Sequence, residues 1–382
     1  MTESTARSVT ESKAGAPHGV VVTYSTRDDE GAHEAHTREA VAAKLATIRR
    51  FDFGGPYDPA IHDATKRYFV PSDTLIGVDT AAKLGIRSED DLFGGVVPHA
   101  FAATKTITHP LVDKQAQAPR GWSRNFASRV DGAVLHGYTA FNRDDAQRAS
   151  ARLLDHGPAR IKLARGIGGH GQFVIQDQGE LNKLLEAIDE TEMHSAGVVL
   201  EEHLDQVTTH SVGQVRVAGR VASYWGTQRT TRNNRGNEVY GGSDLVVVRG
   251  GFRALRALPL STDAQLALSR ALVYDSAAEA SFAGFFASRR NYDVVEGTDA
   301  RGRRRAGVLE QSWRIGGASA AEVEALLAFD SNRALSAVRA STVEVFGAEP
   351  ALPAHAVVFF SGIDPRVGAI THYVTVEPYG DL

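Results

Sequence analysis

The segment at residues 159–175, ARIKLARGIGGHGQFVI, constrains the fold of this chain more than any other part of the sequence. A strand pattern that carries Lys162 leads into a glycine-rich turn. The residues after the turn alternate in the way that predicts a second strand. Phosphate-binding loops of the P-loop and dinucleotide types continue into a helix, so the second strand excludes both. The glycines can still bring backbone N–H groups close to a ligand. The segment is therefore either a structural turn or a cover for phosphates, and the nearby lysine favours the cover.

The order of the expected elements indicates a mixed α/β protein. A strand at 19–25, a helix within 27–50 and a strand within 68–77 predict a small layer with a parallel sheet. The stretch 111–134 carries no regular pattern, and 211–248 reads as strands interrupted by a long polar loop. The other expected elements are helices at 80–84, 143–156, 180–192 and 262–280, and strands at 159–164, 172–176 and 197–200.

Length and composition fit a protein of two or three packed domains. The chain has 382 residues, of which 42% are hydrophobic and 23% are charged, as in globular proteins. Residues 1–18 are polar and lack the apolar core of a secretory signal, and no stretch approaches 18 consecutive apolar residues. We therefore expect a disordered tail at 1–18 and a cytoplasmic protein that contacts no membrane.

Two glutamates follow an apolar strand in the sequence VVLEEHLDQ at residues 198–206. Burying both carboxylates would cost free energy unless hydrogen-bond donors lie beside them. One interpretation is a strand that emerges into solvent at Glu201. The other is a linker whose backbone and one carboxylate contact the amino group of a purine.

Two carboxylates face each other across a hairpin expected at residues 291–312. Asp293 and Glu310 lie on its two strands, and opposed carboxylates raise each other's pKa unless a cation lies between them. No lysine lies beyond residue 183, so the cation is either Mg²⁺ held with phosphate oxygens or an arginine. The arginine candidates are Arg289, Arg290 and Arg314. The chain has no cysteine, which excludes thiolate metal sites and a cysteine nucleophile.

Taken in this order, these segments resemble the ATP-grasp superfamily. The family pattern has a first lysine, a second lysine with a glycine-rich loop, a Glu-Glu hinge, a metal-binding aspartate and a run that begins with a metal-binding glutamate. The matching residues are Lys105, Lys162 with the glycines at 166–171, Glu201-Glu202-His203-Leu204, Asp293 and the run EQSWR at 310–314. The resemblance covers about residues 100–320, and more narrowly it looks like a proteobacterial ATP-grasp-related family of unknown function.

The resemblance implies an α/β fold of the mixed α+β kind, namely the ATP-grasp fold preceded by a small N-terminal α/β domain. The implied boundaries are a pre-ATP-grasp domain at 19–104, a first ATP-grasp lobe at 105–200 and a second lobe at 201–382. The first lobe would carry the glycine-rich phosphate loop. The second lobe would carry the metal site and the C-terminal segment.

The resemblance also implies a role for each matching residue. ATP would contact Lys105, Lys162, Gly168, Gly169, His170, Gly171, Glu201, Glu202, Leu204 and Asp205. Mg²⁺ would be held by Asp293, Glu310 and Ser312. The catalytic residues would be Lys162 and Arg314, with the arginine stabilising the transferred phosphoryl group. The substrate end would be lined by Arg229, Arg232, Arg290, Gly316, Gly317 and Ser319.

Three positions depart from the family pattern. Ser312 stands where the family has a metal-binding asparagine, and it offers a shorter oxygen ligand. Thr209 stands where a ribose-binding glutamate is expected, which leaves Asp205 as the substitute. Lys105 lies farther from Lys162 than is usual, so Lys114 is an alternative for the first lysine.

Two arginine-rich segments lie outside these motifs. The loop expected at 227–243 is either a lid that brings arginines to an anionic substrate or an ordinary solvated loop. Arg301 and the arginines at 303–305 are predicted to form a solvated basic turn at the hairpin tip. A net charge of −4 gives no electrostatic footprint for nucleic acid, so we expect no nucleic-acid partner.

The resemblance implies an ATP- and Mg²⁺-dependent ligase that joins a small-molecule carboxylate to an amine through an acyl phosphate. A small-molecule kinase that uses the same nucleotide site is an alternative. A nucleotide-binding regulatory protein without turnover is a third interpretation, motivated by Ser312. Dimers are common among similar proteins, so a homodimer is also an expectation.

Overall fold

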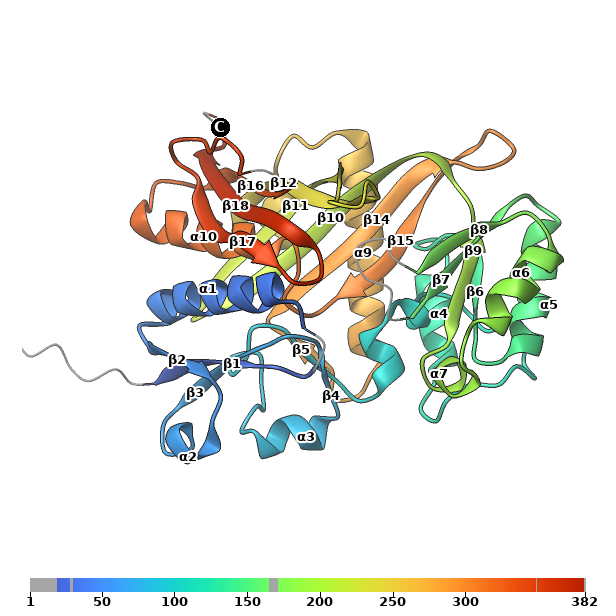
Figure 1. Cartoon of the computed structure of the whole chain (residues 1–382), viewed down its shortest axis with the longest axis horizontal. Coiled ribbons are helices and arrows are strands. Elements are labelled where there is room, and N and C mark those ends of the chain that lie inside the picture. The colour runs from blue at the N-terminus through green and yellow to red at the C-terminus, as the bar shows by residue number, and fades with distance from the viewer. Residues whose placement is uncertain (1–18, 28–29, 165–170, 348, 381–382) are drawn as a thin grey trace, which may run out of the picture.

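The computed structural model describes residues 19–27, 30–164, 171–347 and 349–380. The described chain forms four β-sheets, of three, three, four and eight strands, with helices packed between and around them (Figure 1). The predicted tail at 1–18 lies outside the described residues, as do Gly168, Gly169 and His170 of the glycine-rich turn.

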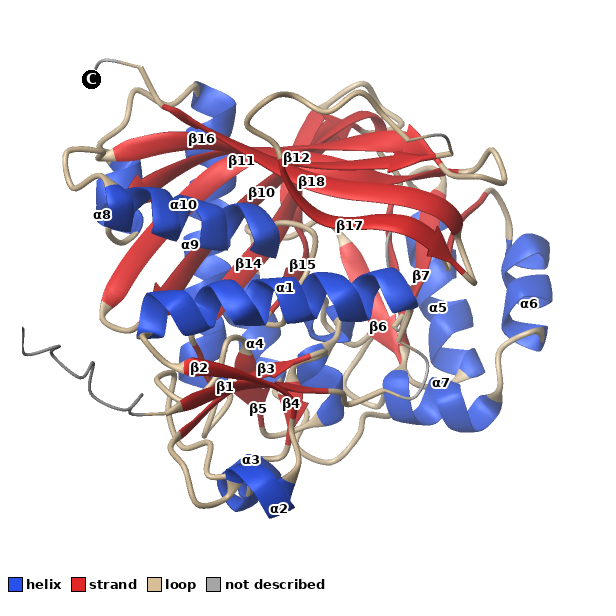
Figure 2. Ribbon diagram, turned by 60° about the vertical axis from the view of Figure 1, so that its left-hand side comes forward, coloured by secondary structure: helices blue, strands red, loops and turns tan. Residues whose placement is uncertain are grey.

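The N-terminal sheet is the parallel layer that the sequence predicts. Its strands β1 (Val20–Tyr24), β2 (Asp52–Pro56) and β3 (Arg67–Pro71) pair in the order β2-β1-β3. Helix α1 (Ala32–Arg49) lies between this sheet and the large sheet (Figure 2), and its Val41 and Leu45 share one core with Val21. Strand β2 was not predicted, because its sequence DFGGP has no alternating apolar pattern.

A second small sheet joins the N-terminal part to a segment far along the chain. Its strands are β4 (Leu75–Ile76), β5 (Gly95–Val97) and β13 (Phe286–Ala287), in the order β13-β5-β4. The Oγ of Ser288 accepts from the Gly94 amide at 3.1 Å. The N-terminal part is therefore hydrogen-bonded to the chain just before the predicted carboxylate hairpin.

Four antiparallel strands form the sheet that contains the lysine hairpin. They are β6 (Gly137–Ala140), β7 (Ala159–Leu163), β8 (Gln172–Ile175) and β9 (Val198–Glu202), in the order β6-β9-β7-β8. Helices α5 (Arg143–Leu154) and α6 (Gln178–Glu186) cover the face into which Ile161 and Leu200 point. Because side chains alternate along a strand, Lys162 and Glu201 lie on the opposite face.

The largest sheet is fully antiparallel and has eight strands. They are β10 (Asp205–Val217), β11 (Arg220–Arg232), β12 (Glu238–Arg249), β14 (Arg289–Thr298), β15 (Arg304–Ser312), β16 (Ala337–Phe346), β17 (Val357–Asp364) and β18 (Gly368–Pro378). Their order is β15-β14-β10-β11-β12-β16-β18-β17. Helix α9 (Thr262–Ser281) packs on one face, and α10 (Ser319–Ser331) and α1 pack on the other. Tyr292 points toward α9, so its neighbour Asp293 points to the opposite face.

Three expectations about elements are wrong. The polar segment 227–243 is not a long loop, because β11 and β12 run through most of it and only residues 233–237 separate them. The helix expected at 180–192 is two helices, α6 and α7 (Glu190–Ala196), because Asp189 caps α7 by accepting from the Glu192 amide at 2.9 Å. The stretch 111–134 contains helix α4 (Arg124–Val130), capped by Ser123.

The remaining helices are short. They are α2 (Pro59–His62), α3 (Val78–Lys83), α8 (Phe252–Arg256) and the 3-10 helices η1 (Ala100–Ala103) and η2 (Lys105–Thr108). The side chain of Thr104 begins η2 by accepting from the Thr106 amide at 3.3 Å. Among the described residues, no helix has both the length and the apolar character needed to cross a membrane.

Candidate active site

A buried ion pair lies where the lysine strand β7 meets strand β9. Lys162 Nζ lies 2.5 Å from Glu201 Oε1, and the two side chains are 3% and 1% exposed. His109 Nε2 donates to Glu201 Oε2 at 3.1 Å. Burial alone would raise the pKa of Glu201, but the Lys162 charge and the His109 hydrogen bond hold it at about 2. The interpretation in which the strand emerges into solvent at Glu201 is therefore wrong.

One short segment links this ion pair to the opposed carboxylates. Helix η2 begins with Lys105, which is 5% exposed and whose Nζ lies 2.8 Å from Glu310 Oε2. His109 follows η2 directly and reaches Glu201 at the other end of the segment. Lys114, the alternative first lysine, is exposed. Of the two candidates for the first lysine, Lys105 is therefore the one that contacts an opposed carboxylate.

Asp293 and Glu310 are direct register partners across the β14–β15 hairpin. Burial and the neighbouring Glu310 charge raise the pKa of Asp293 to about 7, although Gln228 Nε2 donates to Asp293 Oδ1 at 2.8 Å. The pKa is raised even with Lys105 beside Glu310, as expected where two carboxylates share too little positive charge. A divalent cation would supply that charge.

The three arginines considered as counter-ions for these carboxylates pair elsewhere. Their ion-pair distances include 2.8 Å for Arg289–Glu322, 2.9 Å for Arg290–Asp275 and 3.2 Å for Arg314–Asp73. These partners lie on α10, on α9 and just after β3. None of the three arginines forms an ion pair with Asp293 or Glu310, so the interpretation in which these carboxylates pair with an arginine is wrong. The charge of Arg289 still acts to lower the pKa of Asp293.

The donor set at the hairpin fits Mg²⁺. Ser312 lies two residues after Glu310 on the same face of β15, and its Oγ accepts from Arg289 Nη1 at 3.2 Å. Among the described residues, no three or more histidine, cysteine, aspartate or glutamate side chains are grouped to hold a metal ion. Two carboxylates and a hydroxyl nevertheless suit Mg²⁺, which prefers oxygen ligands and keeps several waters. Waters and phosphate oxygens would complete its coordination.

Glu202 and Asp205, the other predicted acidic contacts of the nucleotide, lie away from the buried ion pair. Glu202 Oε1 accepts from Arg305 Nη2 at 3.0 Å, and the Glu202 amide donates to His136 O at 2.8 Å. The Asp205 side chain is 75% exposed and lies 3.5 Å from His203 Nε2. The structure therefore does not bring either carboxylate to the buried ion pair.

An apolar cluster adjoins the hinge. Leu204 is buried and packs with Leu135, Val295 and the partly buried Leu309. Val295 lies two residues after Asp293 on β14, so this apolar cluster is on the same face of the sheet as the opposed carboxylates. Apolar side chains beside a few fixed polar groups are typical of a small-molecule site. Leu204 is among the predicted ATP contacts, whereas Leu135, Val295 and Leu309 were not predicted, because single leucines and valines in strands carry no functional signal.

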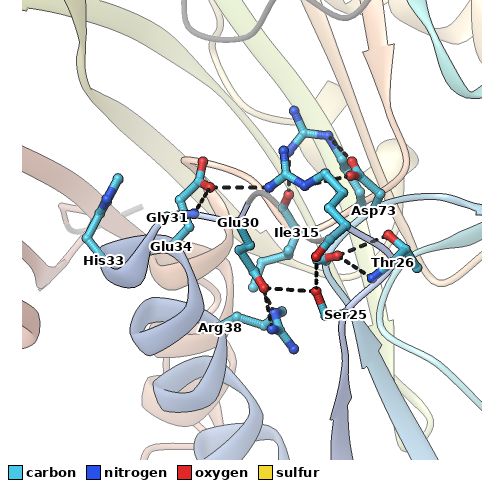
Figure 3. A network of polar contacts seen from close by, with 12 residues as sticks. Ser25, Thr26, Glu30, Gly31, His33, Glu34, Arg38, Asp73 and Ile315 are labelled. Atoms are coloured by element: carbon cyan, nitrogen blue, oxygen red, sulfur yellow. Dashed lines mark hydrogen bonds and ion pairs between the residues drawn. The ribbon is translucent and has the colours of Figure 1, made fainter. Parts of the chain in front are cut away.

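A polar network that includes Asp73, Ser25 and Glu34 lies at the start of α1 (Figure 3). Asp73 pairs with Arg314 Nε at 3.2 Å and with Arg27 Nε at 3.1 Å. Arg27 also pairs with Glu34, near the start of α1, at 3.2 Å. Burial raises the pKa of Asp73, although both arginines act to lower it. The N-terminal part of the chain therefore holds the side chain of Arg314.

The predicted substrate residues after Arg314 form a tight turn at the start of α10. Ser319 Oγ accepts from the Gly316 amide at 3.0 Å. A Cβ atom at Gly317 would lie 2.5 Å from the ring of Tyr240. Only glycine fits at this position without moving the tyrosine.

Arg229 and Arg290, which were predicted to line the substrate end, lie on the face of the large sheet opposite to Asp293. Arg229 Nη1 pairs with Asp244 at 2.6 Å, whereas Gln228, the residue before it, donates to Asp293. Strand alternation therefore directs Arg229 to the other face of the sheet, and Arg290 points toward α9 on that face. Arg232 is exposed and donates to a carbonyl of its own turn, so its substrate role stays a prediction.

Comparison with known proteins covers most of the chain. Residues 21–374 match the family described as Protein of unknown function (DUF3182). The chain belongs to this family. No curated protein sequence matches the chain.

Solved structures similar to this DUF3182 chain share its architecture. An N5-carboxyaminoimidazole ribonucleotide synthetase bound to ADP is 11% identical with a TM-score of 0.52, covering 95% of this chain and 93% of that one. Phosphoribosylamine–glycine ligase from Thermotoga maritima is 14% identical with a TM-score of 0.51, covering 94% and 92%. Biotin carboxylase from Campylobacter jejuni is 11% identical with a TM-score of 0.51, covering 94% and 87%. The DUF3182 chain has the ATP-grasp fold with a small N-terminal α/β domain, so the predicted resemblance is confirmed.

Proposed function

We propose that this protein is an ATP- and Mg²⁺-dependent ligase that joins a carboxylate to an amine and releases ADP and phosphate. The observation that carries the proposal is the segment from Lys105 to His109, which contacts Glu310 at one end and Glu201 at the other. Through these contacts it connects two lysines, a hinge carboxylate and the opposed carboxylates. The similar solved structures include a synthetase, a ligase and a carboxylase, which supports this class of reaction.

In this proposal Lys105 and Lys162 bind the phosphates of ATP. Each lysine pairs with a carboxylate, and a phosphate oxygen can share the same ammonium group because it has three donors. Glu201 orients Lys162 and accepts from the amino group of adenine. The apolar cluster around Leu204 and Leu309 packs against the adenine ring.

Catalysis by these residues rests on positioning and charge stabilisation rather than on a covalent enzyme nucleophile. A substrate carboxylate oxygen attacks the γ-phosphorus, ADP leaves, and the amine nitrogen then displaces phosphate from the acyl phosphate. Asp293, Glu310 and Ser312 would hold Mg²⁺, which when bound neutralises and orients the phosphate oxygens. Arg314 exchanges its partner Asp73 for the transferred phosphoryl group and stabilises its negative charge.

The experiment that tests the proposal measures ATP consumption by the purified protein with Mg²⁺ and pooled carboxylic acids and amines. Release of ADP and phosphate that needs both an acid and an amine is the expected result. A phosphorylated acceptor as the stable product would instead indicate a small-molecule kinase. Tight ATP binding without turnover in any pool would indicate a nucleotide-binding regulatory protein.

We expect the protein to prefer ATP over GTP by at least about tenfold in affinity, which is about 1.4 kcal/mol. The carboxylate of Glu201 can accept from the adenine amino group but not from the carbonyl at the same position of guanine. Competition between the two nucleotides, followed by thermal stabilisation, measures the preference. Equal stabilisation by ATP and GTP would contradict the contact between Glu201 and adenine.

Replacing Ser312 by asparagine should lower the Mg²⁺ concentration needed for half-maximal ATP consumption. The amide oxygen of asparagine reaches farther than the serine hydroxyl, and water fills the position that serine leaves open. A Mg²⁺ titration of wild type and Ser312→Asn measures the change, with the exposed Ser331→Asn as the control. An unchanged requirement in Ser312→Asn would place Ser312 away from the metal.

A further inference from the structure

A pocket with a volume of about 430 Å³ lies between α9, the β14–β15 hairpin and the segment at 132–134. Arg270, Arg304 and Arg305 line it together with the carboxylates of Asp263 and Glu296. The pocket lies on the α9 side of the large sheet, and Asp293 faces the other side. We call it the α9 pocket. It is separate from the proposed nucleotide site.

The positive charges in the α9 pocket are unevenly compensated. Arg304 Nη2 lies between both carboxylates of the pocket, 3.2 Å from Asp263 and 3.3 Å from Glu296. Arg305 pairs at 3.0 Å with Glu202, which does not line the pocket. Arg304 thus forms ion pairs with both carboxylates of the pocket. Neither neutralises Arg270 or Arg305.

Arg270 has no carboxylate partner among the described residues, and one of its hydrogen-bond donors is unused. Its Nη1 donates to Gly132 O. Its Nε is buried and has no hydrogen-bond partner within the described part of the chain. Burial lowers the pKa of Arg270, and the neighbouring Arg305 lowers it further. Glu202 already pairs with Arg305, so Arg270 is the half-buried guanidinium of this pocket that has no carboxylate partner within the described residues. An anion that contacts Arg270 and shares Arg305 with Glu202 would lower the cost of burying this charge.

We propose that the α9 pocket binds a small molecule through an oxyanion, a phosphate or a carboxylate, held by Arg270 and Arg305. A guanidinium presents its donors in a planar fork that matches both oxyanions, so one anion can contact the two arginines at once. The pocket is larger than a phosphate ion and has the size usual for small-molecule sites. The oxyanion is therefore one group of a larger molecule. The proposal does not depend on the proposed ligase function.

Calorimetric titration of the full chain with inorganic phosphate, without nucleotide and at constant ionic strength, tests the proposal. Wild type is expected to bind phosphate, and Arg270→Gln and Arg305→Gln should each weaken binding by at least about tenfold, the effect of one charge-assisted hydrogen bond. Arg301→Gln removes the same charge from the nearby hairpin tip, outside the α9 pocket, and should bind like wild type. A parallel titration with acetate distinguishes phosphate from carboxylate.

Two results would overturn the proposal. One is a wild-type protein that binds neither phosphate nor acetate. The other is equal phosphate affinity in wild type, Arg270→Gln and Arg305→Gln, which would place the anion elsewhere, for example at the lysines of the nucleotide site. Arg305 is 38% exposed, so its variant keeps the test valid if Arg270→Gln fails to fold.

Discussion

Replacing Glu310 by glutamine should lower the rate of ATP consumption by on the order of a hundredfold or more, the scale of losing one charged group that acts in the transition state. The substitution keeps the shape of the side chain but removes one of two opposed carboxylates. It also removes the charge that pairs with Lys105. A steady-state assay of ADP release, with the acid and amine that wild type accepts, measures the effect.

The fold should survive this substitution, because the Glu310 side chain is 36% exposed and its loss relieves the repulsion with Asp293. Glu279→Gln is the matched control, since it removes the same charge from α9 on the opposite face of the sheet. Normal turnover in Glu310→Gln would rule out Glu310 as a metal ligand. Equal loss in Glu279→Gln would show that the effect comes from net charge alone.

Much of the fold could be predicted from the sequence because its signals are local. The alternation around Lys162 predicted the β7–β8 hairpin, and the apolar runs near Asp293 and Glu310 predicted the β14–β15 hairpin. The opposed carboxylates followed from that hairpin, because direct register partners share one face of a sheet. The continuation of β11 and β12 through 227–243 could not be predicted, since this polar segment lacks the apolar alternation of a strand.

The partners of the charged residues could not be predicted, because they lie far away in the sequence. His109 reaches Glu201 across 92 positions, and Lys105 reaches Glu310 across an even longer separation. Neither the histidine nor the lysine lies in a local pattern that identifies its partner. The three-dimensional packing of η2 between the two larger sheets creates both contacts. The order of motifs along the sequence can therefore identify the candidate residues of the site. Which of their charges pair with each other is known only from the structure.

Replacing Lys162 by methionine should lower the free energy of unfolding by about 3–5 kcal/mol, the usual effect of removing one partner from a buried ion pair. Glu201 would keep its charge in a buried position with only His109 beside it. Chemical denaturation of wild type and variant measures the loss. Lys183→Met, on the exposed surface of α6, is the control and should leave the stability nearly unchanged.

The ion pair between Lys162 and Glu201 also predicts how the free energy of unfolding depends on pH. The pKa of Glu201 is about 2 in the folded chain, below the usual value of 4.5, so its stabilising contribution is complete above pH 4.5. That contribution is lost as the pH falls from 4.5 toward 2. Glu201→Gln has no carboxyl to protonate there, so its stability should fall less steeply than that of wild type over this range. Parallel slopes for the two proteins would contradict the low pKa.

The double variant Lys162→Met with Glu201→Gln separates folding from nucleotide binding. Removing both charges leaves no unpaired ion in the buried position, so most of the stability lost in Lys162→Met should return. ATP affinity should not return, because the ammonium group proposed to hold the phosphates and the carboxylate proposed to accept from adenine are both missing. A stable double variant that binds ATP at least tenfold more weakly than wild type is the expected result. If that stable variant bound ATP like wild type, Lys162 would be a structural residue and the proposed phosphate contact would be wrong.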